Sequence, residues 1–375
     1  MMKKVYLDNA STTQINPEVI QVMVKVLSDD FGNPSSTHSL GRNAKSVLEL
    51  SRKAIAKQLN CTSQEIIFSS CGTESNNWIL RSAVKDLNVT RIITSKMEHH
   101  AVLHTVQALQ KEFNIQVDYV SIKLDGSIDI TSLVDLLSQE KKTLVSLMHV
   151  NNEIGTVLDI DLVGRICQQH NALFHSDTVQ SIGKTKIDLQ TLAVDFIVAS
   201  AHKFHGPKGI GFAFVRKKSY LQPLFHGGEQ EKGLRPGTEG VHQIAGMAKA
   251  LELSCDNLEH DRKHILELRT YLISRLKIDF PDFKINGSLD GFYTVLNILL
   301  PLSKDKTAMI LFHLDMKGIA VSRGSACQSG SISTSHVLTE IISAEDATKP
   351  SLRISFSHYN TKEDIDILMK ALNEI

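Results

Sequence analysis

Residues 200–211 read S-A-H-K-F-H-G-P-K-G-I-G, and this segment decides how the rest of the chain is interpreted. Apolar runs flank it at 194–199 and 212–215, and short runs of this kind indicate buried strands. Lys203 therefore stands where a buried strand ends. Burial disfavours the ammonium form, and a neutral amine can form a Schiff base. Taken alone, Lys203 is more simply an exposed loop lysine, but the residues upstream favour the reactive alternative.

The composition is that of an ordinary globular protein with a small ligand. The length of 375 residues suggests about two domains, and 42% of the residues are hydrophobic. The 41 basic and 41 acidic residues cancel, which argues against nucleic acid or an anionic membrane as a partner. No apolar run is long enough for a signal peptide or a membrane span, so we expect a cytoplasmic protein. The five cysteines form no C-x-x-C pair, which argues against a disulfide framework and a zinc knuckle.

Strand and helix signals alternate through the first two thirds of the chain. Strands are indicated at 65–68, 91–94, 117–122, 144–150, 172–174 and 194–199, with helical patterns at 98–113 and 133–137. Such alternation predicts a parallel sheet covered by helices on both faces. Beyond residue 240 the pattern changes to a long helical stretch at 241–276, a strand at 292–299, a helix near 306–317 and a final helix opened by Thr361. This part is expected to form a smaller C-terminal domain.

Polar clusters follow several of the predicted strands. The turn 69–77, S-S-C-G-T-E-S-N-N, lies between a strand and a helix and contains Gly72 and Thr73. A small-residue turn at a helix N-terminus presents free N–H groups that suit a phosphate. Further clusters occur at 98–100, 151–153, 175–180 and 200–203. Because ligands collect at the carboxyl ends of parallel strands, we expect these clusters to share one site.

A zinc site is the alternative interpretation, but no H-E-x-x-H or comparable ligand spacing occurs, so no metal is expected. A cofactor with a phosphate, a ring and an aldehyde accounts for the clusters together. Thr73, Ser200 and His202 could hold the phosphate, His99 could stack on the ring, Asp177 could pair with a pyridinium nitrogen and Lys203 could form the imine. This combination of groups is suited to binding pyridoxal phosphate.

The chain resembles the NifS/IscS-type cysteine desulfurases, which are class V aminotransferase-family enzymes with the aspartate-aminotransferase-like fold (fold type I). The matching motifs run from L-D-N-A-S-T-T at 7–13 to L-R-I-S-F-S at 352–357 and include M-H-V-N-N-E-I-G at 148–155, H-G-G-E-Q-E-K-G-L-R-P-G-T at 226–238 and S-R-G-S-A-C at 322–327. The resemblance implies an α/β fold with a mostly parallel sheet in a large domain at 15–255. It also implies a smaller α+β domain that combines 1–14 with 256–375 and carries the catalytic cysteine loop.

The resemblance also implies the reaction and the residues that perform it. L-cysteine would become L-alanine, and its sulfur would remain as a persulfide on Cys327 before transfer to an acceptor protein in iron–sulfur cluster assembly or tRNA thiolation. Lys203 would carry pyridoxal phosphate, with His99 over the ring, Asp177 on the ring nitrogen and Gln180 on the ring oxygen. Gly72, Thr73, Ser200 and His202 would take the phosphate, joined by Thr238 of the partner subunit in a homodimer. Asn152 and Arg353 would bind the substrate carboxylate.

Two alternatives remain open at this point. One is a selenocysteine lyase or another pyridoxal phosphate lyase of the same fold, and the other is a non-catalytic sulfur-relay protein. The sequence also departs from the family pattern at four places: Cys71 stands for a glycine, Thr178-Val179 for Ala-Thr, and Pro236 and Arg323 for small residues. None of these changes removes a catalytic group.

Overall fold

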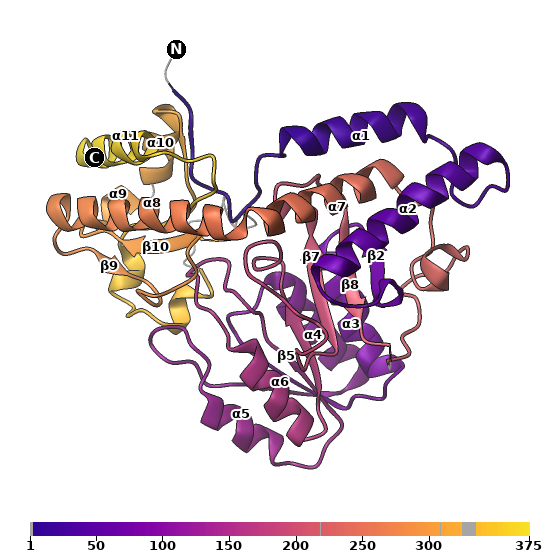
Figure 1. The fold of residues 1–375 in the computed structure, drawn as a ribbon. Helices are drawn as coiled ribbons and strands as arrows, with labels where there is room; N and C mark the ends of the chain where they lie inside the picture. Colours follow the sequence, from indigo (N-terminus) through magenta and orange to yellow (C-terminus); the bar gives the residue numbers. More distant parts are fainter. Residues whose placement is uncertain (1–2, 218, 308, 325–334) are drawn as a thin grey trace.

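A computed structural model describes residues 3–217, 219–307, 309–324 and 335–375. Its centre is a seven-stranded sheet in the order β2-β8-β7-β6-β5-β3-β4 (Figure 1). The strands are β2 Ile66–Ser69, β3 Arg91–Thr94, β4 Gln116–Tyr119, β5 Thr143–Ser146, β6 Leu173–Asp177, β7 Phe196–Ser200 and β8 Gly211–Val215. All neighbouring pairs are parallel except the two that involve β8. The prediction of a mostly parallel sheet is confirmed.

The reversal of β8 follows from its connection. Only residues 201–210 join it to β7, and so short a link suits antiparallel neighbours, because parallel strands need a longer crossover. Since β8 is antiparallel to both β7 and β2, β2 again runs in the direction of the parallel strands. The carboxyl ends of β2, β3, β5, β6 and β7 therefore meet at one edge of the sheet, and every polar cluster found in the sequence follows one of these strands.

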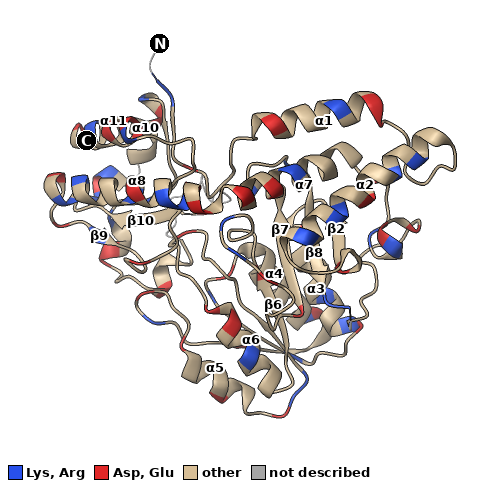
Figure 2. Cartoon of the chain, viewed as in Figure 1, with Lys and Arg blue, Asp and Glu red and all other residues tan. Residues whose placement is uncertain are grey.

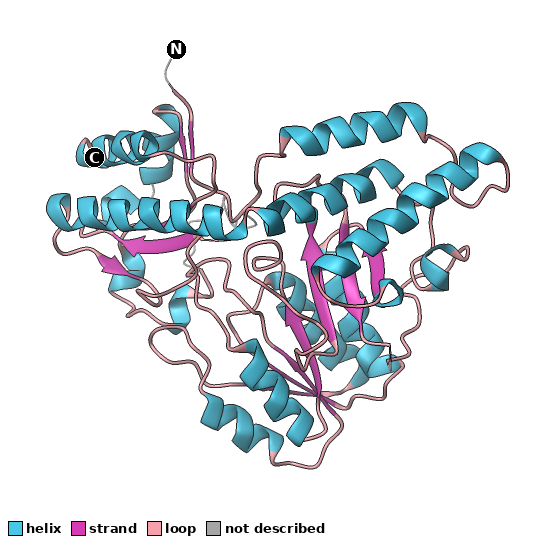
Figure 3. Cartoon of the chain, viewed as in Figure 1, coloured by secondary structure: helices cyan, strands magenta, loops and turns pink. Residues whose placement is uncertain are grey.

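Helices cover both faces of this sheet, as Figure 3 shows. One face packs on α1 Pro17–Asp29, α2 Ser39–Gln58, α5 Ile130–Leu137, α6 Ile160–Gln169 and α7 Val241–Asp256. The other packs on α3 Gly72–Lys85 and α4 His100–Phe113. Within β7, Ile197 and Ala199 belong to the first core and Phe196 and Val198 to the second, because successive strand residues point to opposite faces. This two-sided burial explains why central strands such as β7 and β8 are almost entirely apolar.

A second, smaller core lies beside the large sheet. Its elements are β1 Val5–Tyr6, α8 Leu258–Asp279, β9 Lys284–Ile285, β10 Val295–Leu299, α9 Lys304–Thr307, α10 Ile310–Met316, β11 Ile319–Ala320, β12 Ser351–Ser355 and α11 Lys362–Asn373. Strands β12, β10 and β9 form an antiparallel sheet, and β1 pairs with β11. Val5 and Leu7 are buried with residues from 265–372. We therefore propose the division into a domain at 15–255 and one that joins 1–14 to 256–375.

The helical stretch expected at 241–276 is present, but it consists of two helices. Asn257 ends α7 and caps α8 with φ −98° and ψ 6°, which breaks the helix there. The two halves have different partners, because α7 packs on α1 and α2 whereas α8 packs on α11. The capping box predicted at Thr361 is confirmed, since its side chain accepts a hydrogen bond from the backbone N–H of Asp364.

Basic and acidic residues are interspersed along the chain in both parts (Figure 2), as the balanced composition leads one to expect. Within the part of the chain that the structure describes, no helix has both the length and the apolar character needed to span a membrane.

Candidate active site

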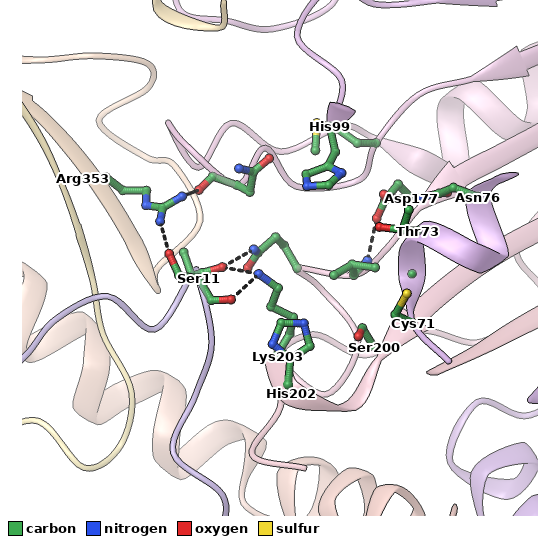
Figure 4. A pocket seen from close by; sticks show the side chains of 16 residues that line it. Ser11, Cys71, Thr73, Asn76, His99, Asp177, Ser200, His202, Lys203 and Arg353 are labelled. Atoms are coloured by element: carbon green, nitrogen blue, oxygen red, sulfur yellow. Dashed lines mark hydrogen bonds between the residues drawn. The ribbon is translucent and has the colours of Figure 1, made fainter. Parts of the chain in front are cut away.

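A cavity of about 240 Å³ lies at the carboxyl edge of the sheet, where it meets the smaller core (Figure 4). Ten residues expected from the sequence line it: Gly72, Thr73, His99, Asn152, Asp177, Gln180, Ser200, His202, Lys203 and Arg353. They lie at or after the carboxyl ends of five different strands, and Arg353 lies in β12 itself. The expectation that the polar clusters would share one site is confirmed.

One end of the cavity is formed by the N-terminus of α3 and is equipped for an anion. Cys71 is the N-cap, and its side chain makes no capping hydrogen bond, so the N–H groups of the first turn remain available. The Ser200 hydroxyl is buried without a hydrogen-bond partner among the described residues. A Cβ atom at Gly72 would lie 2.7 Å from Cγ2 of Val179, so only glycine fits there. Cys71 itself has φ −175°, an extended conformation that cysteine adopts without strain.

Lys203 lies beside the N-terminal segment of the chain. It ends a short 3₁₀ turn, Ala201–Lys203, that directly follows β7. Its Nζ donates hydrogen bonds to the backbone carbonyls of Ala10 at 2.6 Å and Ser11 at 2.8 Å. Burial, together with the charge of Lys203, lowers the pKa of nearby Lys184 to about 7. The positive charge of Lys203 thus disfavours a second ammonium group at Lys184.

Asp177 is the last residue of β6, and both of its carboxylate oxygens accept hydrogen bonds. Oδ1 accepts from the backbone N–H of Val179 at 3.0 Å, and Oδ2 accepts from Nδ2 of Asn76 at 2.7 Å. His99 caps α4, and its Nδ1 accepts a hydrogen bond from the backbone N–H of Ala101. Burial lowers the pKa of His99, so its ring is neutral near neutral pH. Asn76 lies in the quoted T-E-S-N-N segment, but sequence reasoning gave it no role.

Arg353 is fully buried in β12 and held from several directions. Nη1 donates to the backbone carbonyl of Asn152 at 2.9 Å, and Nη2 donates to Oδ1 of Asp8 at 2.9 Å and to Oγ of Ser11 at 2.6 Å. Its Nε has no hydrogen-bond partner among the described residues. The guanidinium is therefore fixed at the cavity wall, as expected for a residue on a strand. The partners Asp8 and Ser11 belong to the motif at 7–13, and sequence reasoning left both without a role.

Gln180 and His202 also contact the N-terminal segment. Nε2 of Gln180 donates to the backbone carbonyl of Ala10 at 2.8 Å. Nδ1 of His202 lies 3.1 Å from Oγ1 of Thr12. Burial and nearby lysines lower the pKa of His202 to about 3, so its ring is neutral. Segment 10–12 thus contacts residues that lie 170 to 190 positions further along the chain.

Thr238 and Cys327 are the two predicted site residues that the structure does not show in the cavity wall. Thr238 is exposed and does not line the cavity of its own chain. Cys327 lies outside the described residues. Gly324 and Ser335, the described residues that flank Cys327 in the sequence, both lie beside Glu153. Oγ of Ser335 donates a hydrogen bond to the Glu153 carboxylate, and a Cβ atom at Gly324 would lie 3.0 Å from Oε2 of Glu153. Glu153 follows Asn152, which lines the cavity, so Gly324 and Ser335 both lie beside the cavity.

Stability is expected to fall as pH decreases from about 6.5 to about 4. Burial lowers the pKa of five histidines to about 3 or 4: His100, His149, His175, His202 and His205. These rings stay neutral when folded but take up protons when unfolded, so acid favours unfolding. Glu98 acts oppositely, because burial raises its pKa and its neutral form favours folding in acid. Urea midpoints measured across this range test the balance, and a midpoint that stays constant or rises would contradict it.

Comparisons with known proteins identify the family. The aminotransferase class-V family model matches residues 5–368. The cysteine desulfurase IscS of Clostridium botulinum (strain Kyoto / Type A2) is 38% identical over all of this chain and 95% of its own length. A solved structure titled NifS-like protein is 36% identical with a TM-score of 0.92 over 99% of both chains. A structure titled SspA in complex with cysteine is 31% identical with a TM-score of 0.83 and covers 95% of this chain and 100% of its own.

The site and the sheet define a fold type I enzyme of the aspartate-aminotransferase-like class. Within that class, the chain belongs to the class-V aminotransferase family and, inside it, to the NifS/IscS-type cysteine desulfurases. The recognition made from the sequence, its fold class and its enzyme class are thereby confirmed. Across residues 3–217, 219–307, 309–324 and 335–375, no three His, Cys, Asp or Glu side chains are arranged to hold a metal ion.

Proposed function

We propose that this chain is a pyridoxal phosphate-dependent cysteine desulfurase that converts L-cysteine to L-alanine. The observation that carries the proposal is the convergence of ten residues, found separately in the sequence, on the wall of one cavity. Family membership supports the same reaction. A non-catalytic relay protein would have no need for a complete set of cofactor-binding groups.

The residues present fit the cofactor. When bound, pyridoxal phosphate supplies an aldehyde that condenses with amines and a protonated ring that accepts electrons from a carbanion. The uncapped turn at Gly72 and Thr73, the unpartnered hydroxyl of Ser200 and the neutral ring of His202 would hold the phosphate. Asp177 would hold the proton on the ring nitrogen. Lys203 would supply the amine that the substrate replaces, and would then move a proton at the substrate Cα.

The substrate carboxylate is assigned to Arg353 and Asn152. The buried guanidinium keeps a positive charge at the cavity wall, and its planar fork suits a carboxylate. Hydrogen bonds to Asp8, Ser11 and the backbone of Asn152 fix its orientation before substrate arrives. The relative whose title states a complex with cysteine supports this amino acid as the substrate.

Cys327 is the proposed nucleophile. Its thiolate would attack the sulfur of bound cysteine, so that an S–S bond forms as the substrate C–S bond breaks. The carbon that loses sulfur takes up a proton, alanine leaves and a persulfide remains on Cys327. Cys61, Cys167 and Cys255 are unsuited to this role, because burial raises their pKa values to about 11 or 12 and the thiol form is not nucleophilic.

We assign the active form to a homodimer in which each subunit gives Thr238 to the cavity of the other. Two features support this arrangement. Thr238 is exposed and lies outside its own cavity. In addition, Ile20, Val24 and Leu27 form an apolar stripe along α1 with 44%, 55% and 54% of each residue exposed, and a second subunit would cover it. We further propose a cytoplasmic location and a sulfur-acceptor protein in iron–sulfur cluster assembly or tRNA thiolation.

The proposed function is tested by supplying purified protein with pyridoxal phosphate, a thiol reductant and L-cysteine. Alanine and sulfide are expected in equal amounts. A parallel reaction with L-selenocysteine separates the alternatives, because a preference for that substrate identifies a selenocysteine lyase. A protein that stays colourless after incubation with the cofactor would overturn the proposal in favour of a non-catalytic role.

A further inference from the structure

Asn76 is a buried amide on the inner face of α3. It is 1% exposed, and its Nδ2 donates a hydrogen bond to Oδ2 of Asp177 at 2.7 Å. The other oxygen of Asp177 accepts a hydrogen bond from the backbone N–H of Val179. Asn76 is thus the side-chain donor to this carboxylate among the described contacts. Both residues line the cavity, and Figure 4 shows them side by side.

The hydrogen bond to Asp177 selects one of the two possible orientations of the Asn76 amide. Its Oδ1 is buried and has no hydrogen-bond partner among the described residues, which is a costly state for a polar atom. Rotating the amide by half a turn would not relieve this cost, because it would place Oδ1 against the Asp177 carboxylate and remove the donor. The unsatisfied oxygen is therefore the consequence of keeping Nδ2 on Asp177.

The Asp177 carboxyl group is buried, and these two donors fix its orientation. It is 6% exposed, and burial disfavours the charged form of a carboxyl group. The buried carboxyl of Glu98 lies close enough for Asp177 to contribute to raising its pKa. Hydrogen bonds from N–H groups favour the ionised form. Without Asn76, Oδ2 would lose its donor, and among the described contacts the backbone N–H of Val179 would be left to orient the carboxyl group.

We propose that Asn76 is a positioning residue that keeps the Asp177 carboxylate oriented toward the ring nitrogen of bound pyridoxal phosphate. The inference rests on the proposed function and deepens it. Asn76 lies four residues after Gly72 on the same helix, a rise of about 6 Å. Helix α3 would therefore set the position of the phosphate with its N-terminus and that of the ring aspartate with its second turn.

The test compares Asn76→Leu, which keeps the approximate volume and removes the amide, with Asn77→Leu as a matched control. Among the described contacts, the Asn77 amide donates to the carbonyl of Thr73 in its own helix and not to Asp177. Two properties of reconstituted protein are measured: the dissociation constant of pyridoxal phosphate and the ¹⁵N chemical shift of cofactor labelled at the ring nitrogen. For Asn76→Leu we expect about 10- to 100-fold weaker binding, the effect of losing a hydrogen bond to a charged group, and a shift toward the unprotonated ring. Asn77→Leu is expected to match wild type in both.

A double-mutant cycle makes the assignment specific. If Asn76 acts through Asp177, then Asn76→Leu adds nothing further once Asp177→Asn is present. Independent effects of the two changes on the chemical shift would overturn the inference, as would a wild-type shift in Asn76→Leu. Should Asn76→Leu fail to fold, Asn76→Ser is measured against the same outcomes. Failure of the proposed function is distinct, because then wild-type protein itself would bind no cofactor.

Discussion

Cys327→Ser is expected to abolish persulfide formation and sulfide release while cofactor binding remains unchanged. A serine hydroxyl is ionised far less readily than a thiol and cannot form an S–S bond, so the substrate C–S bond keeps its sulfur. The substitution changes none of the residues proposed to hold the cofactor, so its binding should be unaffected. Sulfide release with a thiol reductant should fall by at least about 10²-fold, and the visible spectrum of the cofactor should still respond to added cysteine.

Cys255→Ser is the matched control. This thiol is half-buried, and burial together with Asp256 raises its pKa to about 11, so its loss should leave sulfide release near the wild-type rate. Unchanged sulfide release in Cys327→Ser would remove Cys327 from the mechanism. A large loss in Cys255→Ser would mean that the reactive thiol lies elsewhere.

Lys203→Ala is expected to abolish alanine formation and covalent attachment of the cofactor. The variant lacks the amine that would condense with the aldehyde and move the proton at the substrate Cα. The loss of the proton transfer alone is worth about 10²- to 10⁴-fold in rate. Borohydride treatment of wild-type protein should trap the cofactor on the peptide that contains Lys203, and mass spectrometry of the variant should find no trapped cofactor.

Lys208→Ala provides the comparison for Lys203→Ala. Lys208 lies in the same loop but is exposed, and it does not line the cavity. Its replacement should leave both trapping and alanine formation intact. Cofactor trapped at another lysine in Lys203→Ala, with alanine still formed, would show that Lys203 is not the reactive amine.

Much of the site could be predicted because it depends on local patterns and on one rule of sheet topology. The turn at Gly72 and Thr73, the polar residues after β6 and the lysine after β7 each follow an apolar strand in the sequence. Parallel strands bring their carboxyl ends to one edge. The sequence alone therefore predicts that residues such as His99 and Asp177 lie close together. The antiparallel strand β8 does not change this arrangement, because none of the ten site residues lies on it.

Other features depend on contacts between distant residues and could not be predicted. Asn76 and Asp177 are separated by 101 positions, and Asp8 and Arg353 by 345, so no local pattern signals either hydrogen bond. The break at Asn257 could not be predicted, because neither glycine nor proline marks it in the sequence. It lies where the chain passes from α7, which packs in the core of the large sheet, to α8, which packs in the smaller core.

The central claim is that sulfur leaves cysteine by becoming bound to Cys327. The most direct measurement is a single turnover of reconstituted protein with L-cysteine and no reductant, followed by quantification of alanine and mass spectrometry of the Cys327 peptide. The account predicts one alanine for each added sulfur atom, located on Cys327 and absent in Lys203→Ala. Alanine formed without sulfur on Cys327, or sulfur found on another cysteine, would contradict it.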